Sequence, residues 1–141
     1  MFVTQKELEQ IYYITREINM WQRELDSLKT KSKVSSPVLT GMPEGKGTTG
    51  DRVGNSATRI AYLEQKIKDK KAELEILRTN VIEYIMSIDD SLTRQIVKLR
   101  CIDLKSWTSI AIEIGGNNTA GSVRKWYVRH IKKNLSQKKE K

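Results

Sequence analysis

Apolar side chains recur every three or four residues along two long stretches of this chain. The first stretch covers residues 4–32, where the spacing is unbroken. Its apolar positions are Ile11, Ile14, Ile18, Trp21, Leu25 and Leu28. Intervals of three and four place such residues in one stripe on an α-helix, as in the seam of a coiled coil. We therefore predict a helix over residues 4–32, with Thr4 and Glu7 in the spacing of a capping box.

The second stretch begins near Asp51 or Ser56 and ends at Ile88. Its seam contains Val53, Ile60, Leu63, Ile67, Lys70, Leu74, Leu77, Val81, Tyr84 and Ile88. Only Lys70 interrupts the apolar series. A polar seam residue can fix register or partner number, or its stem can pack while its ammonium stays in water. The sequence does not decide between these two roles of Lys70.

The two seams are separated by residues 33–50, which contain two prolines and four glycines. Both residue types favour turns over helix, so we predict a flexible loop here. Two amphipathic helices joined by such a loop predict an antiparallel, coiled-coil-like helical hairpin over residues 1–88. A hairpin of two helices buries little apolar surface, which indicates that this part oligomerises.

After the hairpin, the pattern changes to shorter helical segments over residues 89–135. Asp89, Asp90 and Ser91 offer a new N-cap. The following helix over residues 92–102 carries its apolar stripe at Leu92, Ile96, Leu99 and Ile102. A short apolar helix then opens at Trp107 and includes Ile110, Ala111 and Ile114, and Gly115 and Gly116 allow the positive φ that ends it.

The last predicted helix has one apolar and one cationic face. Asn118 or Thr119 can cap it. The face predicted to point inward contains Val123, Trp126, Tyr127, His130, Ile131 and Asn134. The opposite face contains Asn118, Gly121, Ser122, Lys125, Arg129 and Lys132, flanked by Arg124 and Lys133. Small and amide side chains near the N-terminus with cations farther along are typical of a helix in the DNA major groove.

Charge is distributed unevenly along the 141 residues. Residues 1–90 hold 14 Lys/Arg and 14 Asp/Glu, whereas residues 91–141 hold 12 Lys/Arg and three Asp/Glu, so the net charge of +9 lies in the C-terminal part. Such asymmetry is typical of a protein that binds a polyanion, because neutralised phosphates release counterions. The alternative is a solvated basic face, with the basic tail over residues 136–141 serving solubility.

Little in the chain supports catalysis or metal binding. Cys101 is the one cysteine and His130 the one histidine, too few for a zinc site or an internal disulfide. We expect Cys101 to be a small core residue and His130 a packed or hydrogen-bonded one. We therefore predict no enzyme, no cofactor and no metal. Since no long apolar run or signal pattern occurs, we expect no membrane association and a cytoplasmic location.

Three short motifs in residues 92–133 carry a family resemblance. They are Arg94 with Leu99 and Arg100, Trp107 with Ile110 and Ala111, and the Gly-Asn-Thr turn leading to Ser122, Val123 and Arg124. This run resembles the sigma-factor region-four-like domain of phage-encoded regulators of the ArpU and RinA kind. Upstream, residues 40–43 with Asp51 are similar to a segment that precedes such domains in phage proteins. One departure is that Ala111 to Val123 is longer than in the commonest helix-turn-helix units.

The sequence thus predicts an all-α protein, with a long helical hairpin followed by a helix-turn-helix DNA-binding domain. We expect a sequence-specific regulator of transcription that binds double-stranded DNA as a homodimer. The resemblance implies that it acts on phage late genes in a bacterial host cell, with host RNA polymerase as a further partner. Candidate base contacts are Asn118, Ser122, Lys125 and Arg129. Candidate phosphate contacts are Arg94, Lys98, Arg124, Lys132 and Lys133. The alternatives are a coiled-coil interaction protein and a small-terminase-like DNA packaging component.

Overall fold

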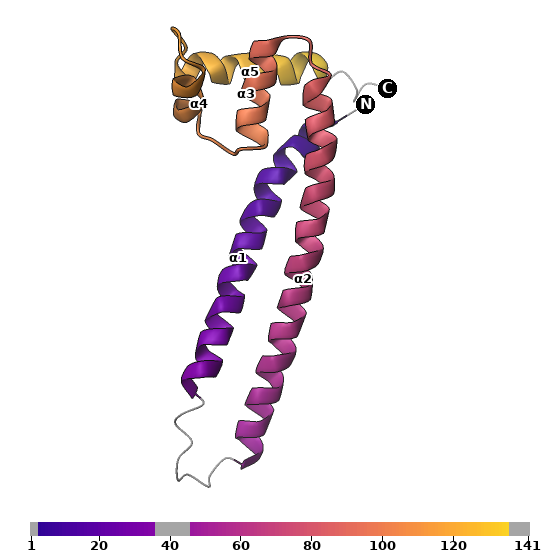
Figure 1. The fold of residues 1–141 in the computed structure, drawn as a ribbon, viewed down its shortest axis with the longest axis vertical. Coiled ribbons are helices and arrows are strands. Elements are labelled where there is room, and N and C mark those ends of the chain that lie inside the picture. Colours follow the sequence, from indigo (N-terminus) through magenta and orange to yellow (C-terminus); the bar gives the residue numbers. More distant parts are fainter. Residues whose placement is uncertain (1–2, 36–45, 136–141) are drawn as a thin grey trace. The chain divides into compact units, whose positions relative to one another are not determined.

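Five α-helices form the described part of the protein (Figure 1). A computed structural model describes residues 3–35 and 46–135, and the side chains of residues 3–31 and 56–135. The helices are α1 (Gln5–Ser35), α2 (Lys46–Met86), α3 (Ser91–Cys101), α4 (Trp107–Ile114) and α5 (Ala120–Asn134). No β-strand occurs within these ranges, which confirms the predicted all-α class.

The described residues fall into two compact units. One consists of the described parts of Met1–Ile14 and Leu74–Lys141, and the other is Thr15–Glu73. The start of α1 and the end of α2 are therefore grouped with α3, α4 and α5. The hairpin predicted from the sequence instead placed residues 1–88 in one domain. The fold of each unit follows from its own apolar pattern.

In the unit Thr15–Glu73, the predicted seams meet. Ile18, Leu25, Leu63 and Ile67 are buried, as their heptad spacing predicted. Lys29 pairs with Glu64 at 3.2 Å, and Lys70 pairs with Glu17 at 3.7 Å. The later residue of α1, Lys29, pairs with the earlier residue of α2, Glu64, and the earlier residue of α1, Glu17, pairs with the later residue of α2, Lys70. These segments therefore run in opposite directions.

Lys70 combines features of both interpretations that the sequence left open. Its side chain retains 36% exposure, and its ammonium lies 3.3 Å from Glu73 and 3.7 Å from Glu17. The hydrogen bond and charge of Glu73, with the charge of Glu17, raise the pKa of Lys70. The cation is thus matched by carboxylates at a position that water still reaches.

The ends of the long helices differ from the prediction. α1 continues to Ser35 and α2 begins at Lys46, within the predicted loop over residues 33–50. The rest of that loop, residues 36–45, lies outside the described residues. A glycine costs a helix roughly 1 kcal/mol relative to alanine, and a long helix can offset that cost in its first turns.

The other unit begins with the predicted cap. Thr4 accepts from the amide of Glu7 at 3.2 Å, and Glu7 accepts from the amide of Thr4 at 2.8 Å, which confirms the capping box. Leu8, Ile11 and Val81 are almost fully buried in this unit. Their burial anchors the beginning of α1 and the second half of α2.

Helices α3, α4 and α5 pack on one another around a small apolar core. The buried members of this core are Ile96, Leu99, Ile110, Ala111 and Val123, with Leu92, Trp107, Ile114 and Tyr127 at its margin. Asp90 caps α3 and Ser106 caps α4 through their side chains. Arg100 lies over the Trp107 ring at 4.3 Å and donates to the Lys105 carbonyl at 3.0 Å, which fixes the connection between α3 and α4.

Candidate nucleic-acid interface

The turn between α4 and α5 is set by two glycines. Gly115 has φ 76° and Gly116 has φ 63°, as their sequence position predicted. The Gly115 amide closes α4 by donating to the Ala111 carbonyl at 2.9 Å. The Asn118 side-chain amide then donates to the Gly115 carbonyl at 2.9 Å. Asn118 therefore stabilises the turn, and Thr119 becomes the N-cap of α5.

A reciprocal cap starts α5. Thr119 accepts from the Ser122 amide at 3.1 Å, and Ser122 accepts from the Thr119 amide at 2.9 Å. The Ser122 hydroxyl also donates to the Thr119 carbonyl at 3.0 Å. The hydroxyl proton of Ser122, a predicted base contact, is thus engaged in a hydrogen bond of the cap.

One face of α5 is buried and the other is cationic. Val123 is buried in the core with α3 and α4, and Tyr127 is half-buried against it. Ile131 is buried as well. Lys125 and Arg129 are exposed on the opposite side, where the sequence predicted base contacts. Arg124, Lys132 and Lys133, three of the predicted phosphate contacts, are exposed as well.

The α5 sequence itself contains cations but no acid. From Ala120 to Asn134 it includes five Lys/Arg and no Asp/Glu. Among the described residues, none forms an ion pair or hydrogen bond with the side chains of Arg124, Lys125, Arg129 or Lys133. Cations that the fold leaves unmatched produce a positive potential that favours a polyanion.

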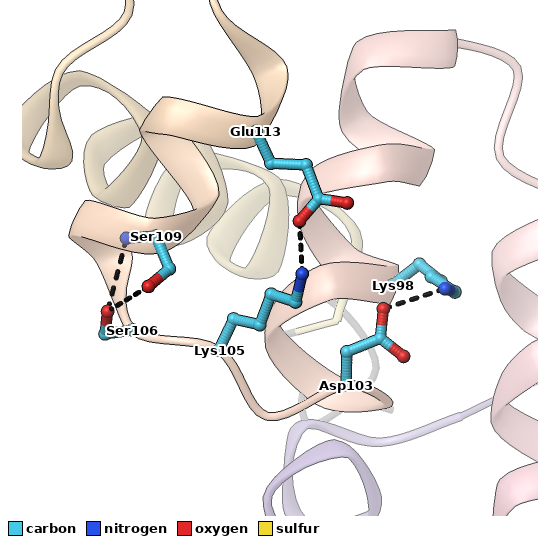
Figure 2. A network of polar contacts seen from close by, with 6 residues as sticks. All are labelled: Lys98, Asp103, Lys105, Ser106, Ser109 and Glu113. Atoms are coloured by element: carbon cyan, nitrogen blue, oxygen red, sulfur yellow. Dashed lines mark hydrogen bonds and ion pairs between the residues drawn. The ribbon is translucent and has the colours of Figure 1, made fainter.

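The two acids of residues 91–135 are matched elsewhere, as Figure 2 shows. Asp103 accepts from Lys98 at 2.7 Å, and Glu113 on α4 accepts from Lys105. Each pair joins residues outside α5. The two acids thus neutralise Lys98 and Lys105, and neither of them pairs with Arg124, Lys125, Arg129 or Lys133.

Two predicted phosphate contacts have local partners instead. Lys98 pairs with Asp103. The Arg94 guanidinium donates to the carbonyls of Ile88 and Asp89 at 2.7 and 3.3 Å and is half-buried. Both side chains therefore help to hold the ends of α3.

Trp126 departs from its predicted inward position. It is 40% exposed, and its indole N–H donates to the Thr93 hydroxyl at 2.7 Å. Thr93 in turn donates to the Asp90 carboxylate at 2.6 Å, and this bond lowers the pKa of Asp90. Asn134, also predicted inward, is exposed too. Both residues lie near the edge of the apolar stripe, where spacing alone does not decide burial.

A groove of about 290 Å³ lies beside Trp126. Its lining includes Trp126, Arg129 and Lys133 from α5 and Asp90 and Thr93 from the start of α3. Sequence reasoning missed this groove. The available signal was the spacing of Trp126 and Lys133, which are seven residues apart and so lie on one side of a helix.

His130 is held by two neighbours. Its Nε2 lies 2.8 Å from the Tyr84 hydroxyl, and its Nδ1 lies 3.0 Å from Nδ2 of Asn134. Asn134 Nδ2 also donates to the His130 carbonyl at 3.1 Å, and an amide nitrogen can only donate, so His130 Nδ1 acts as the acceptor. The ring is then neutral with its proton on Nε2. Burial lowers the pKa of His130, which favours the neutral form of the ring.

Cys101 behaves as a core residue, as predicted. It is 4% exposed, and its sulfur lies 3.4 Å from the Tyr127 hydroxyl. Burial raises the pKa of Cys101 to about 11 and also raises that of Tyr127. Within the described residues, no three His, Cys, Asp or Glu side chains gather closely enough to hold a metal ion.

Comparisons of the chain with protein-family models, curated proteins and solved structures give no match. None of the described helices combines the length and apolar character needed to cross a bilayer.

Proposed function

We propose that the chain is a sequence-specific, double-stranded DNA-binding regulator of transcription. In this proposal α4 and α5 form a helix-turn-helix unit, α3 supports it, and α5 enters the major groove. The resemblance of residues 92–133 to phage sigma-factor region-four-like regulators assigns it to the control of late genes.

One observation carries the proposal. α5 buries Val123 and Ile131, while Lys125 and Arg129 are exposed without a described ion pair. A helix of 15 residues with five cations and no acid is suited to phosphates and to the acceptor atoms of guanine. Duplex DNA supplies both on one ligand.

The assignments of the predicted contacts can now be refined. Lys125 and Arg129 are the base-reading residues of the proposal, because their side chains are exposed and have no described partner. Arg124, Lys132 and Lys133 hold phosphates. Asn118 and Ser122 act mainly by shaping the start of α5, since the turn engages the Asn118 side-chain NH2 and the cap engages the Ser122 hydroxyl.

Site selection from random duplex DNA tests the proposal directly. We expect the full chain to enrich one motif and to bind it with an affinity that falls steeply with salt, by a factor set by the number of phosphate contacts. Lys125→Ala combined with Arg129→Ala should abolish the enrichment while the helical content is retained. Equal binding of all sequences by the unmodified chain would contradict sequence-specific regulation.

The alternative is a coiled-coil interaction protein or a small-terminase-like packaging component. It is favoured by exposed apolar side chains on α2, of which Ile76 is 66% and Met86 is 74% exposed. Sedimentation equilibrium distinguishes the classes. A dimer agrees with a regulator that binds a two-fold symmetric site, whereas a ring of many subunits supports packaging.

A further inference from the structure

We propose that Trp126 and Lys133 hold the sugar–phosphate backbone of one DNA strand at the edge of α5, and so set the position of Arg129 over the bases. This inference rests on the proposed function. It assigns a backbone-binding groove and a positioning role to an aromatic residue that the helical pattern placed in the core.

The indole ring is fixed before any ligand arrives. Its N–H donates to the Thr93 hydroxyl, and the Thr93 hydroxyl donates to Asp90, with distances of 2.7 and 2.6 Å. Asp90 also accepts from the Thr93 amide at 3.0 Å and thereby caps α3. Trp126 is thus tied by one hydrogen bond to Thr93, which two further bonds hold to Asp90 at the start of the neighbouring helix, so little side-chain entropy is lost on binding.

Despite this anchoring, 40% of Trp126 remains exposed, although Thr93, which holds it, is buried. The exposed part borders the groove that Arg129 and Lys133 also line. Lys133 is two helical turns beyond Trp126 on the same side of α5. The aromatic ring of Trp126 and the cation of Lys133 therefore follow one another along the same side of α5.

The chemistry of the groove favours a sugar–phosphate segment. Deoxyribose presents C–H groups that pack on an aromatic surface, and the adjoining phosphate requires a cation such as Lys133. Asp90 is the acid that lines this groove, and its carboxylate faces the Thr93 hydroxyl and amide. With Arg129 and Lys133 against Asp90, the side chains that line the groove carry a net charge of +1.

This contact would position the neighbouring base-reading residue. Arg129 follows Trp126 by three residues, so a strand held by Trp126 and Lys133 passes beside the Arg129 side chain. Backbone contacts fix the register of a reading helix without carrying sequence information themselves. Trp126 is therefore a positioning residue, and Arg129 is the one that discriminates.

The test is duplex binding by Trp126→Ala and Trp126→Phe over a range of salt concentrations, on the selected site. Trp126→Ala should weaken binding about two- to tenfold at every salt concentration with an unchanged salt slope, because an apolar contact releases no counterions. Trp126→Phe keeps a ring and should retain most of the affinity. Lys133→Gln should instead reduce the slope by about 1.

Tyr62→Ala is the matched control. Tyr62 is an exposed aromatic on α2, and Lys66 lies 5.4 Å from its ring centre. Its removal should leave DNA affinity unchanged. A ¹⁹F NMR spectrum of the chain labelled with 5-fluorotryptophan gives a second measurement, in which the Trp126 signal, identified from Trp126→Phe, should shift with duplex DNA while the Trp21 signal should not.

The outcomes separate the inference from the proposed function. If Lys125→Ala weakens binding but Trp126→Ala and the Trp126 signal do not respond, the inference fails and the function stands. If the chain does not bind DNA, both fail. If single-stranded DNA of equal affinity shifts the Trp126 signal as strongly as the duplex, base stacking replaces the sugar contact and the assignment is overturned.

Discussion

Arg129 and Lys133 are one helical turn apart on α5, yet their predicted contributions to DNA binding differ. Arg129→Ala should cost about 1–3 kcal/mol on the preferred site and relax its sequence preference, because a guanidinium can bind guanine through two hydrogen bonds. Lys133→Ala should weaken preferred and random duplexes equally. Fluorescence anisotropy at one fixed salt concentration measures both, and an equal loss on all sequences for Arg129→Ala would contradict its role in base recognition.

His130 should make the stability of the protein depend on pH. Burial lowers its folded-state pKa below the ordinary 6.5, so the unfolded chain binds more protons between these two values. The free energy of unfolding should therefore rise with pH through this window, and stability should be lost as pH falls below 6.5. Protonation would also place a hydrogen on Nδ1, facing the amide of Asn134.

Urea denaturation between pH 5 and 7.5 tests this dependence. His130→Gln is the matched control, since its amide can still donate to Tyr84 but does not titrate. Because the chain holds one histidine, the variant should flatten the profile in this range. An identical slope in both proteins would assign the titration to other groups.

At the scale of the elements, the turn before α5 tests the role of backbone conformation. Gly115 has φ 76° and ψ −155°, a region that is almost restricted to glycine. A Cβ atom added there would meet nothing within 4 Å, so the cost of Gly115→Ala is conformational and should be about 1–3 kcal/mol.

Gly121→Ala is the same chemical change with the opposite expected sign. Gly121 lies in α5, and its added Cβ would meet only Thr119 Oγ1 at the ordinary distance of 3.9 Å. Loss of freedom in the unfolded chain should stabilise the protein by about 0.4–1 kcal/mol. Thermal denaturation of both variants decides the matter, and a stabilised Gly115→Ala would show that the turn is not built as described.

The sequence could predict the elements because their signals are local and repeated. Seam residues such as Ile18 and Leu63 are buried, and Gly115 and Gly116 turn the chain as predicted. The polar groups were harder to assign. Asn and Ser near a helix N-terminus suit base contacts and caps equally well, and the folded backbone decides between them. Arg94 could not be assigned because its acceptors, the carbonyls of Ile88 and Asp89, become available only where α2 has ended.

At the scale of the whole molecule, Lys70 tests what determines self-association. Its ammonium is matched by Glu17 and Glu73 and is partly exposed, so we expect these ion pairs to contribute little to the free energy of unfolding. Lys70→Met keeps a flexible stem and should leave the molar mass by light scattering unchanged. A new oligomeric mass would instead show that this lysine selects the number of partner helices.

The burial of Cys101 makes its alkylation rate a measure of local opening of the fold. The chain contains one sulfhydryl, which is 4% exposed and remains protonated near neutral pH because its pKa is about 11. An alkylating dye can therefore react appreciably only after the surrounding helices separate. The labelling rate, followed with and without nucleic acid, would report how often the helices around Cys101 open and whether bound nucleic acid makes this opening rarer.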